Sequence, residues 1–249
     1  MQNFEALLRE AELAHGHLCA GQILGVRMAM LGCERLGIDD PKGAGRKRLV
    51  TFVEIDRCAT DAIAVVTGCR LGKRALKFRD WGKMAATFVD LSSPLSDLGS
   101  PLGSSQTPLD GTRTYKAVRI AALESSKQRA RELYPHIEQK NQQQMLAYRE
   151  LPVADLFSER WVRVPLHPRE MPGYKSARIT CEQCGEGINY EREVRQTHHG
   201  LVRTLCEGCA FPESRYYQPL AASLAASLAA EELATRSKAG AETSPPPAH

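Results

Sequence analysis

The stretch RLVTFVEIDRCATDAIAVVTGC, residues 48–69, contains the two hydrophobic patterns that decide the fold. Residues 48–55 are rich in β-branched and aromatic side chains, which predicts a strand. Residues 58–69 combine small and aliphatic side chains, which predicts a helix that ends near Gly68. A strand followed directly by a helix indicates a domain that mixes both kinds of element.

Two further helices are predicted before this stretch. Residues 2–14 and 22–36 carry apolar side chains at the three- and four-residue spacing of an amphipathic helix. Gly37 follows the second segment, where a left-handed residue commonly ends a helix. The apolar positions are Phe4, Leu7, Leu8 and Leu13 in the first segment and Ile23, Val26 and Met30 in the second.

Strands and a long helical region are predicted after it. Residues 75–79 and 84–91 are strand candidates that the intervening turn residues would join as a hairpin. Residues 116–150 are predicted to be largely helical, with an interruption at Pro135. A final strand of this region is expected at residues 157–166, where polar and apolar side chains alternate.

The order of these elements predicts an α+β fold with helices and a mixed or antiparallel sheet, rather than a doubly wound parallel sheet. Segments rich in Ser, Pro and Gly indicate the connections. We therefore expect a core domain at 1–166 with a flexible insertion or connection at 92–113, a linker at 167–180, a zinc-finger domain at 181–220 and a partly disordered tail at 221–249.

The composition is that of a soluble globular protein, with 43% hydrophobic and 25% charged residues. The formal charge of +4 is small and spread along the chain, which argues against a dedicated nucleic-acid module. Because no apolar run reaches the length of a membrane span and the first residues lack a signal-peptide core, we expect a cytoplasmic protein without a membrane partner.

Four cysteines near the C-terminal end form two C-x-x-C pairs, at Cys181 and Cys184 and at Cys206 and Cys209. Two residues between paired cysteines allow one tight turn to present both sulfurs to one ion, and this spacing is typical of zinc sites. Four thiolates leave no open coordination position, so we expect a structural zinc rather than a catalytic one. The weaker alternative is four unrelated buried thiols.

A second group of metal-ligand residues, His15, His17 and Cys19, lies within five positions near the N-terminus. Imidazole and thiolate are usual ligands of transition metals, so this loop could hold a metal. A helix that begins after Cys19 would also favour its thiolate. The residues alone leave open a second interpretation, a surface loop with one satisfied histidine.

The cysteines of the predicted helix at 58–69 are less informative. Cys58 and Cys69 are eleven positions apart and share a helical face, where a cysteine is most often a buried apolar thiol. Asp61, one turn after Cys58, could orient a ligand or form a surface ion pair. The spacing does not decide between these two roles of Asp61.

Three ordered blocks of the chain resemble one family. Residues 15–28, HGHLCAGQILGVRM, are similar to the H-G-H-x-C-P-G-x-x-x-G-x-R signature of the formylmethanofuran dehydrogenase FmdE family. Residues 53–88 resemble the central stretch of that family. The four-cysteine segment resembles a treble-clef zinc finger that some members carry at their C-terminal end.

The resemblance implies an α+β core that dimerises, an auxiliary treble-clef finger, and a metal or active site in the core. Carried over by position, the ligands of this core site are His15, His17, Cys19 and Cys58, with Asp61 and Cys69 nearby. Cys19 and Cys58 are the candidate catalytic residues. Ala20 and Ala64 stand where the family commonly has proline and glutamine, so the resemblance does not carry over a substrate.

On this basis we expect a metal-binding protein, either an accessory protein or a small-molecule enzyme linked to molybdenum, tungsten or one-carbon metabolism. Its cofactors would be Zn²⁺ in the finger and a second transition metal in the core. The expected partners are a second copy of the chain, in a homodimer, and a small-molecule ligand or a molybdenum or tungsten enzyme.

The alternative hypothesis is a regulatory module whose finger contacts nucleic acid or a protein. Arg192, Arg195 and Arg203 lie between the cysteine pairs and favour such a role. Glutamates interleave with them and cancel much of the charge, whereas a phosphate-binding surface needs clustered cations. We therefore do not expect nucleic acid as the partner.

Overall fold

The chain forms two compact units, Met1–Lys175 and Ser176–His249, which are described separately below. The structure is a computed structural model, and it describes residues 1–95, 110–221, 223–224, 227 and 231. The first unit is called the core unit and the second the finger unit. None of the helices within these described ranges is both long and apolar enough to cross a membrane.

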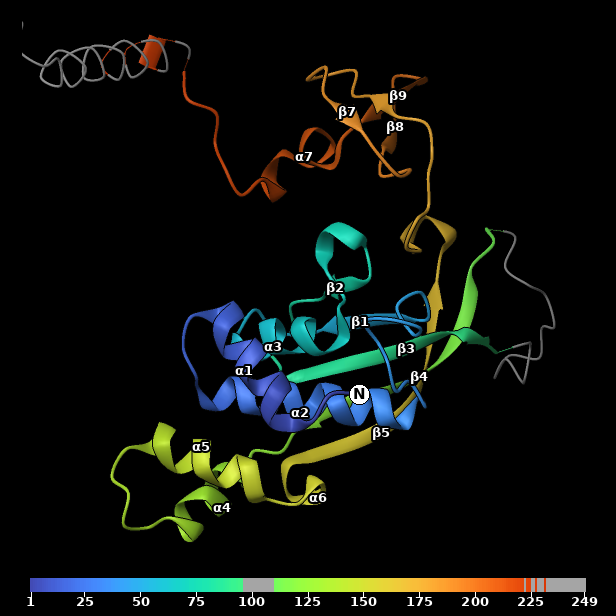
Figure 1. Cartoon of the computed structure of the whole chain (residues 1–249). Coiled ribbons are helices and arrows are strands. Elements are labelled where there is room, and N and C mark those ends of the chain that lie inside the picture. The colour runs from blue at the N-terminus through green and yellow to red at the C-terminus, as the bar shows by residue number, and fades with distance from the viewer. Residues whose placement is uncertain (96–109, 222, 225–226, 228–230, 232–249) are drawn as a thin grey trace, which may run out of the picture. The chain divides into compact units, whose positions relative to one another are not determined.

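The core unit is built on a five-stranded mixed sheet (Figure 1). The strands lie in the order β2-β1-β3-β4-β5, and β1 pairs in parallel with β2 while all other neighbours are antiparallel. Their bounds are β1 Leu49–Val53, β2 Leu76–Phe78, β3 Ala85–Pro94, β4 Arg113–Ala122 and β5 Phe157–Leu166. The α+β class expected from the sequence is confirmed.

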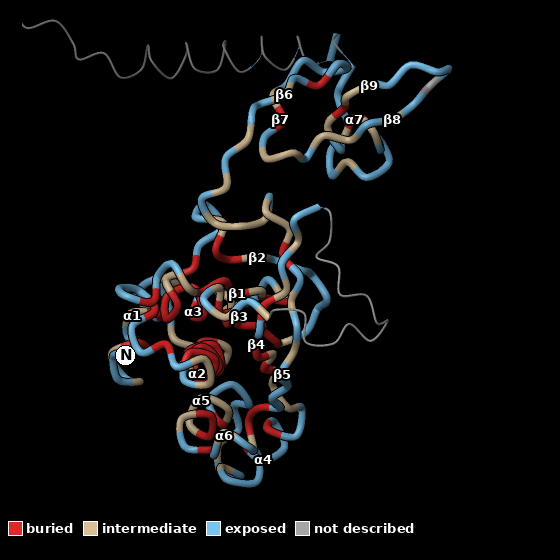
Figure 2. The backbone as a smooth tube through the Cα atoms, turned by 90° about the vertical axis from the view of Figure 1, so that its right-hand side faces the viewer, coloured by how far each residue is buried: buried red, intermediate tan, exposed pale blue. Residues whose placement is uncertain are grey.

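Helices of two kinds complete the described part of the core unit. The α-helices are α1 Phe4–His15, α2 Ala20–Arg35, α3 Cys58–Thr67, α4 Ser125–Leu133, α5 Lys140–Glu150 and α6 Val153–Leu156, and the 3-10 helices are η1 Leu71–Lys73 and η2 Pro168–Glu170. Helix α2 is buried along most of its length (Figure 2) and contacts α1, α3, α5, β3 and β4. Because its sequence carries few charged residues, it can serve as the central helix of the core.

Local signals explain where α1 begins and ends. The Asn3 side chain accepts a hydrogen bond from the Ala6 amide and so caps the first turn. At the other end Gly16 adopts a left-handed conformation with φ 95°, and its amide donates to the Glu12 carbonyl. The chain therefore turns sharply after His15 and soon enters α2 at Ala20.

Glycines in α2 allow its neighbours to approach closely. A Cβ atom placed on Gly25 would lie 2.5 Å from the Ala59 carbonyl oxygen and 2.8 Å from the Ala62 Cβ atom, both in α3. A Cβ atom on Gly32 would collide with the Phe88 ring of β3 at 2.3 Å. Since the contact at Gly25 involves backbone atoms, it cannot be relieved by rotating a side chain.

The predicted hairpin of residues 75–79 and 84–91 is wrong. Strand β2 pairs with β1 rather than with β3, and β1 lies between them. The connection instead wraps over the end of β1, because the Trp81 and Lys83 amides both donate to the Glu54 carbonyl. These hydrogen bonds satisfy the turn without a direct β2–β3 pairing.

The predicted helical region at 116–150 is only partly correct. Its beginning belongs to β4, in which Tyr115, Ala117, Val118 and Ile120 are buried and both edges are paired, with β3 and β5. Helices α4 and α5 form only after residue 124, and Pro135 lies between them. Sheet pairing has overridden local helix propensity here. The connection expected at residues 92–113 begins later than predicted, because β3 extends to Pro94. Residues 96–109 of this connection lie outside the described ranges.

Residues 168–174, expected within a linker, are tied to the core unit. The Arg79 guanidinium forms an ion pair with Glu170 at 3.0 Å. Arg74 and Lys77 donate hydrogen bonds to the carbonyl oxygens of Arg169 and Glu170. The division between the two units consequently falls after Lys175.

The described part of the finger unit consists of two short hairpins followed by a helical turn. The elements are β6 Ile179–Thr180, β7 Gly187–Ile188, β8 Val194–His198, β9 Leu201–Leu205, α7 Glu207–Ala210 and the 3-10 helix η3 Pro212–Ser214. Strands β6 and β7 pair with each other, as do β8 and β9. The buried hydrophobic cluster of this unit is small and comprises Cys181, Ile188, Leu205 and Cys209.

The packing at Gly25 gives a direct test of the α2–α3 contact. Gly25→Ala should lower the free energy of unfolding by about 2 kcal/mol, because a clash with backbone atoms places the overpacking cost near the upper end of about 1–3 kcal/mol, and the helix-propensity gain offsets only about 1 kcal/mol of it. Urea denaturation measures this change. Gly72→Ala is the control, since no heavy atom lies within 4 Å of its added Cβ. A Gly25→Ala midpoint equal to that of the control would contradict the packing argument.

Candidate metal centres

The loop between α1 and α2 brings His15, His17 and Cys19 together. One ligand atom from each residue lies within 4.8 Å of the other two. The left-handed Gly16 turns the chain back on itself, and Cys19 is the N-cap residue of α2. Ligand atoms on one zinc ion are roughly 3.5 Å apart, given bond lengths of about 2.0–2.3 Å. Small side-chain rotations would therefore place these three donors on one metal ion.

Asp61 of α3 contacts the first of these residues. Its Oδ2 atom lies 2.9 Å from Nδ1 of His15, whose side chain is 17% exposed. A carboxylate on one ring nitrogen leaves the other nitrogen available and is the usual arrangement around metal-bound histidine. The structure therefore places Asp61 in contact with a member of the group, and this contact fits both roles that the sequence left open, an orienting residue and a surface ion pair.

Cys58 lies beside this group rather than within it. It is the first residue of α3, and a Cβ atom added to Gly21 would lie 3.2 Å from the Cys58 Cβ and 3.8 Å from the Cys19 Sγ. Burial and a hydrogen bond with the Cys19 thiol raise the pKa of Cys58. The loop therefore offers three donors of mixed type with a second thiol next to them.

A cavity of about 360 Å³ opens next to the two thiols. Cys19 and Cys58 line it, and α4 and α5 contribute Lys127, Asn141 and Tyr148. Sequence reasoning missed these three residues, because only tertiary packing places α4 and α5 next to the N-terminal end of α2. Asn141 also accepts a long hydrogen bond, 3.4 Å, from the Ala20 amide at that end.

Cys69 lies away from this group. It follows α3 at the opposite end from Cys58, roughly 15 Å away along a ten-residue helix. The residue is buried, and its sulfur lies 3.5 Å from the Thr51 hydroxyl. The family resemblance implied that Cys69 lies near the core ligands. This expectation is wrong, because Cys69 lies in the hydrophobic core.

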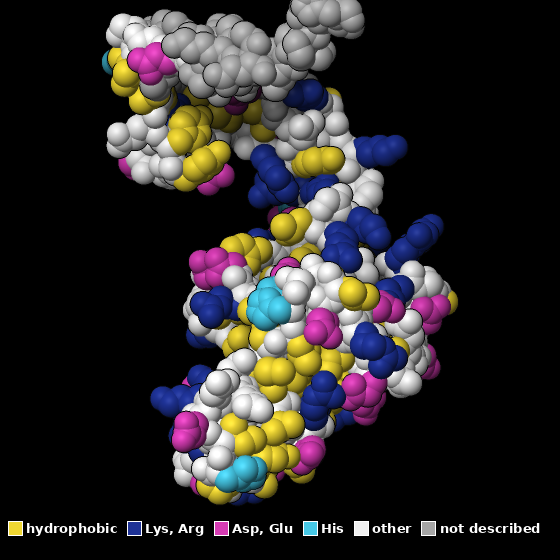
Figure 3. Space-filling model, turned by 60° about the vertical axis from the view of Figure 1, so that its left-hand side comes forward, with side chains coloured by type: hydrophobic (Ala, Val, Ile, Leu, Met, Phe, Trp, Pro, Cys, Tyr) yellow, Lys and Arg dark blue, Asp and Glu magenta, His cyan; other side chains and the backbone are white. Residues whose placement is uncertain are grey.

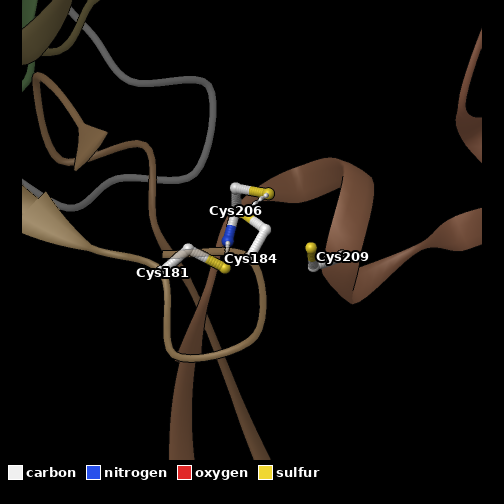
Figure 4. A group of neighbouring side chains, drawn as sticks. All are labelled: Cys181, Cys184, Cys206 and Cys209. Atoms are coloured by element: carbon white, nitrogen blue, oxygen red, sulfur yellow. Dashed lines mark hydrogen bonds between the residues drawn. The ribbon is translucent and has the colours of Figure 1, made fainter. Parts of the chain in front are cut away.

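The second centre lies in the finger unit, where four cysteine side chains surround one point (Figure 4). Cys181 and Cys184 come from the turn between β6 and β7, and Cys206 and Cys209 come from the start of α7. Their four sulfurs lie within 4.8 Å of one another, and the Cys184 and Cys206 sulfurs are 3.9 Å apart. Gly185, with φ 76°, allows the first pair to sit on a tight turn.

The electrostatics of these four thiols favour a bound cation. A hydrogen bond from the Cys184 amide lowers the pKa of Cys181 to about 6, so this thiol ionises readily. Burial and the neighbouring sulfurs raise the pKa of Cys209 to about 12. Ionising all four sulfurs at once therefore requires a positive charge between them, which a divalent metal supplies.

Comparison with known proteins identifies the core. Residues 14–158 match the family described as "FmdE, Molybdenum formylmethanofuran dehydrogenase operon". The chain belongs to the FmdE family. The match contains the whole His15–Cys19 loop as well as Cys58, and it ends before the finger unit begins. The family resemblance of the sequence is thus confirmed.

A solved structure shares the FmdE fold. It is a tungsten formylmethanofuran dehydrogenase FmdE-like protein from Syntrophus aciditrophicus, with a TM-score of 0.52 and 18% sequence identity. The similarity covers 87% of this chain and 96% of that one. At this level of identity it supports the fold alone.

A curated relative shares a shorter region. A probable S-adenosyl-L-methionine-binding protein of Archaeoglobus fulgidus is 40% identical over 84 residues, which is 33% of this chain. The chain spans 23% of the length of that relative.

The FmdE core contains thiols in two distinct environments, which alkylation can distinguish. Cys19 and Cys58 are half-buried beside a cavity, whereas Cys33 and Cys69 are buried and burial raises the pKa of Cys33 to about 12. In metal-free protein at mildly alkaline pH, iodoacetamide should modify Cys19 first among the core thiols and leave Cys33 and Cys69 intact until the core unfolds. Mass spectrometry of peptides from a time course measures this order. Equal rates at Cys19 and Cys33 would refute the assignment.

Proposed function

We propose that this FmdE-family protein is a metal-binding protein with two centres of different purpose. In the core, His15, His17 and Cys19 would hold a transition metal next to Cys58. In the finger, the four cysteines would hold a structural zinc. The observation that carries the proposal is the convergence of three potential donors on one loop, with the Asp61 carboxylate on the first histidine.

The donor set suits a metal such as zinc, since it mixes imidazole and thiolate. A metal held by three protein ligands retains a position for water or a substrate and supplies Lewis-acid chemistry there. Asp61 would fix the ring orientation of His15 through the 2.9 Å hydrogen bond. Cys58 would present a second thiol, whose raised pKa keeps it protonated near neutral pH.

The cavity beside Cys19 and Cys58 supports a small molecule as the ligand of the core site. Its volume of about 360 Å³ lies within the range of about 300–1,000 Å³ typical of ligand pockets. Arg57 and Lys127 line it, together with the apolar side chains of Leu24 and Met84. The protein would act in molybdenum, tungsten or one-carbon metabolism, as an accessory protein or a small-molecule enzyme in the cytoplasm, and as a homodimer.

The order of elements around the four cysteines supports a treble-clef finger. The first pair lies on a turn, a β-hairpin follows, and the second pair lies at the start of a helical turn. A metal joining these elements would close a unit whose hydrophobic cluster is very small.

Metal content tests both centres at once. Protein purified without a metal-chelating tag should contain two metal ions per chain by elemental analysis. The double variant His17→Ala, Cys19→Ser should lose one of them and retain zinc, whereas Cys184→Ser, Cys209→Ser should lose zinc and retain the other. His136→Ala, at an exposed histidine outside the loop, should keep both. A wild-type protein with a single metal that only the finger variant removes would defeat the proposal for the core.

Chelation should unfold the finger unit alone. The core unit contains a large buried cluster, while that of the finger unit comprises four residues, two of them cysteines of the proposed zinc site. Removal of zinc should therefore unfold the finger unit, because metal binding supplies its folding free energy. Limited proteolysis should then cleave within residues 176–215 and leave residues 1–95 and 110–175 protected. Persistent protection of the metal-free finger would contradict this expectation.

A further inference from the structure

A second cavity of the core unit is strongly basic. It has a volume of about 530 Å³ and lies between α1, the loop at residues 40–48, the end of α3 and η1. The cations that line it are Lys42, Arg46, Arg70 and Lys73. It shares no lining residue with the cavity beside Cys19 and Cys58.

Most of this positive charge has no counter-charge among the described residues. Glu10 is the carboxylate of this cavity, and it is occupied by Lys42, whose Nζ lies 2.6 Å from its Oε2. The hydrogen bond from Lys42 lowers the pKa of Glu10, so that the pair is neutral overall. Arg46, Arg70 and Lys73 form no ion pair with any residue that the structure describes.

The loop that presents Arg46 has a defined conformation. The Asp40 carboxylate accepts hydrogen bonds from the amides of Gly43 and Ala44 at 2.9 and 3.0 Å. A Cβ atom on Gly43 would lie 2.0 Å from Asp40 Oδ2, and one on Gly45 would lie 2.6 Å from the side chain of Ile38. Glycine therefore fits best at these two positions. The backbone before Arg46 is consequently held in place before any ligand arrives, which lowers the entropic cost of binding.

The cavity also has an apolar part and an extension. Leu13 and Val65 contribute hydrophobic surface beside the cations. An adjoining hollow of about 540 Å³ shares Arg46, Gly68 and Lys73 with the cavity and adds Lys47. The combined surface thus offers a cluster of cations with apolar side chains beside it.

We propose that this basic cavity binds a phosphorylated small molecule. A diphosphate group would occupy the position between Arg46, Arg70 and Lys73, and a less polar portion would lie against Leu13 and Val65. A diphosphate offers several acceptor oxygens to cations from two separate segments, the loop at residues 40–48 and η1, and guanidinium groups bind phosphate in bidentate fashion. A nucleoside diphosphate is the simplest ligand with both parts.

The size and charge pattern favour a small molecule over a nucleic acid. The volume of about 530 Å³ matches a ligand pocket. A polyanion would need an extended basic surface, but over the middle and lower part of the core unit in Figure 3 Lys and Arg side chains interleave with Asp and Glu. The site is independent of the proposed metal centres, so either proposal can fail without the other.

Calorimetric titration of the full-length protein with inorganic pyrophosphate and with ADP tests the proposal. Both probes should bind the wild type, and more weakly as salt is raised. The double variant Arg46→Gln, Lys73→Gln should bind each probe at least about tenfold more weakly, because two charge-assisted contacts are lost. Since both side chains are exposed, the variant should fold normally, which its melting temperature will show.

The matched control is Arg131→Gln, Lys140→Gln, which removes the same charge from exposed positions on α4 and α5. It should bind both probes as the wild type does. Equal weakening in the two double variants would reduce the effect to net charge and overturn the site. The proposal also fails if neither probe binds, or if a single-stranded oligonucleotide binds at Arg46 and Lys73 while the small phosphates do not.

Discussion

The close approach of α2 to α3 is the constraint on which the core site depends. Gly25 lets the helices touch through their backbones, and Gly21, one turn earlier, lets Cys58 lie directly against α2. The two N-terminal helix ends therefore lie side by side. As a result Cys19 and Cys58 share one cavity, although they are far apart in the sequence. A larger residue at either glycine would push α3 away from α2 and so separate the two thiols, without touching a ligand directly.

One further residue of the quoted FmdE signature holds a neighbouring helix in place. Arg27 extends from α2 and donates hydrogen bonds to the carbonyl oxygens of Tyr148 and Leu151, at 2.8 and 2.6 Å. These carbonyls belong to the C-terminal end of α5, where the positive charge of the guanidinium also interacts favourably with the helix dipole. The contact fixes α5, whose Tyr148 and Asn141 line the cavity. The motif thus combines candidate metal donors, the close spacing of two helices and the placement of the opposite wall of the cavity.

Features with a local cause could be predicted from the sequence, whereas features with a tertiary cause could not. Capping and apolar spacing located the first three helices, and the C-x-x-C spacing indicated a group that the fold brings together. The partner of β2 was mispredicted because pairing with the edge of β1, a tertiary contact, decides it. Strand β4 was mispredicted as helix because its alternating buried and exposed residues run directly into a segment that is helical. The proximity of Cys58 to the His15–Cys19 loop rested on family resemblance alone. Its physical origin is the packing of α2 on α3, and Gly21 and Gly25, one turn apart, do not by themselves tell which helix packs against them.

The two cysteine-containing centres differ in how they depend on a metal. In the finger unit half of the buried hydrophobic cluster consists of cysteines of the four-sulfur group, so the fold there would depend directly on the proposed metal. In the core unit the donors sit on a short loop between two helices that are packed by other residues, and Asp61 already orients His15. Such a site is preorganised without the ion. A preorganised site can exchange its metal or ligand while the protein stays folded, which is what chemistry or metal transfer at the core would require.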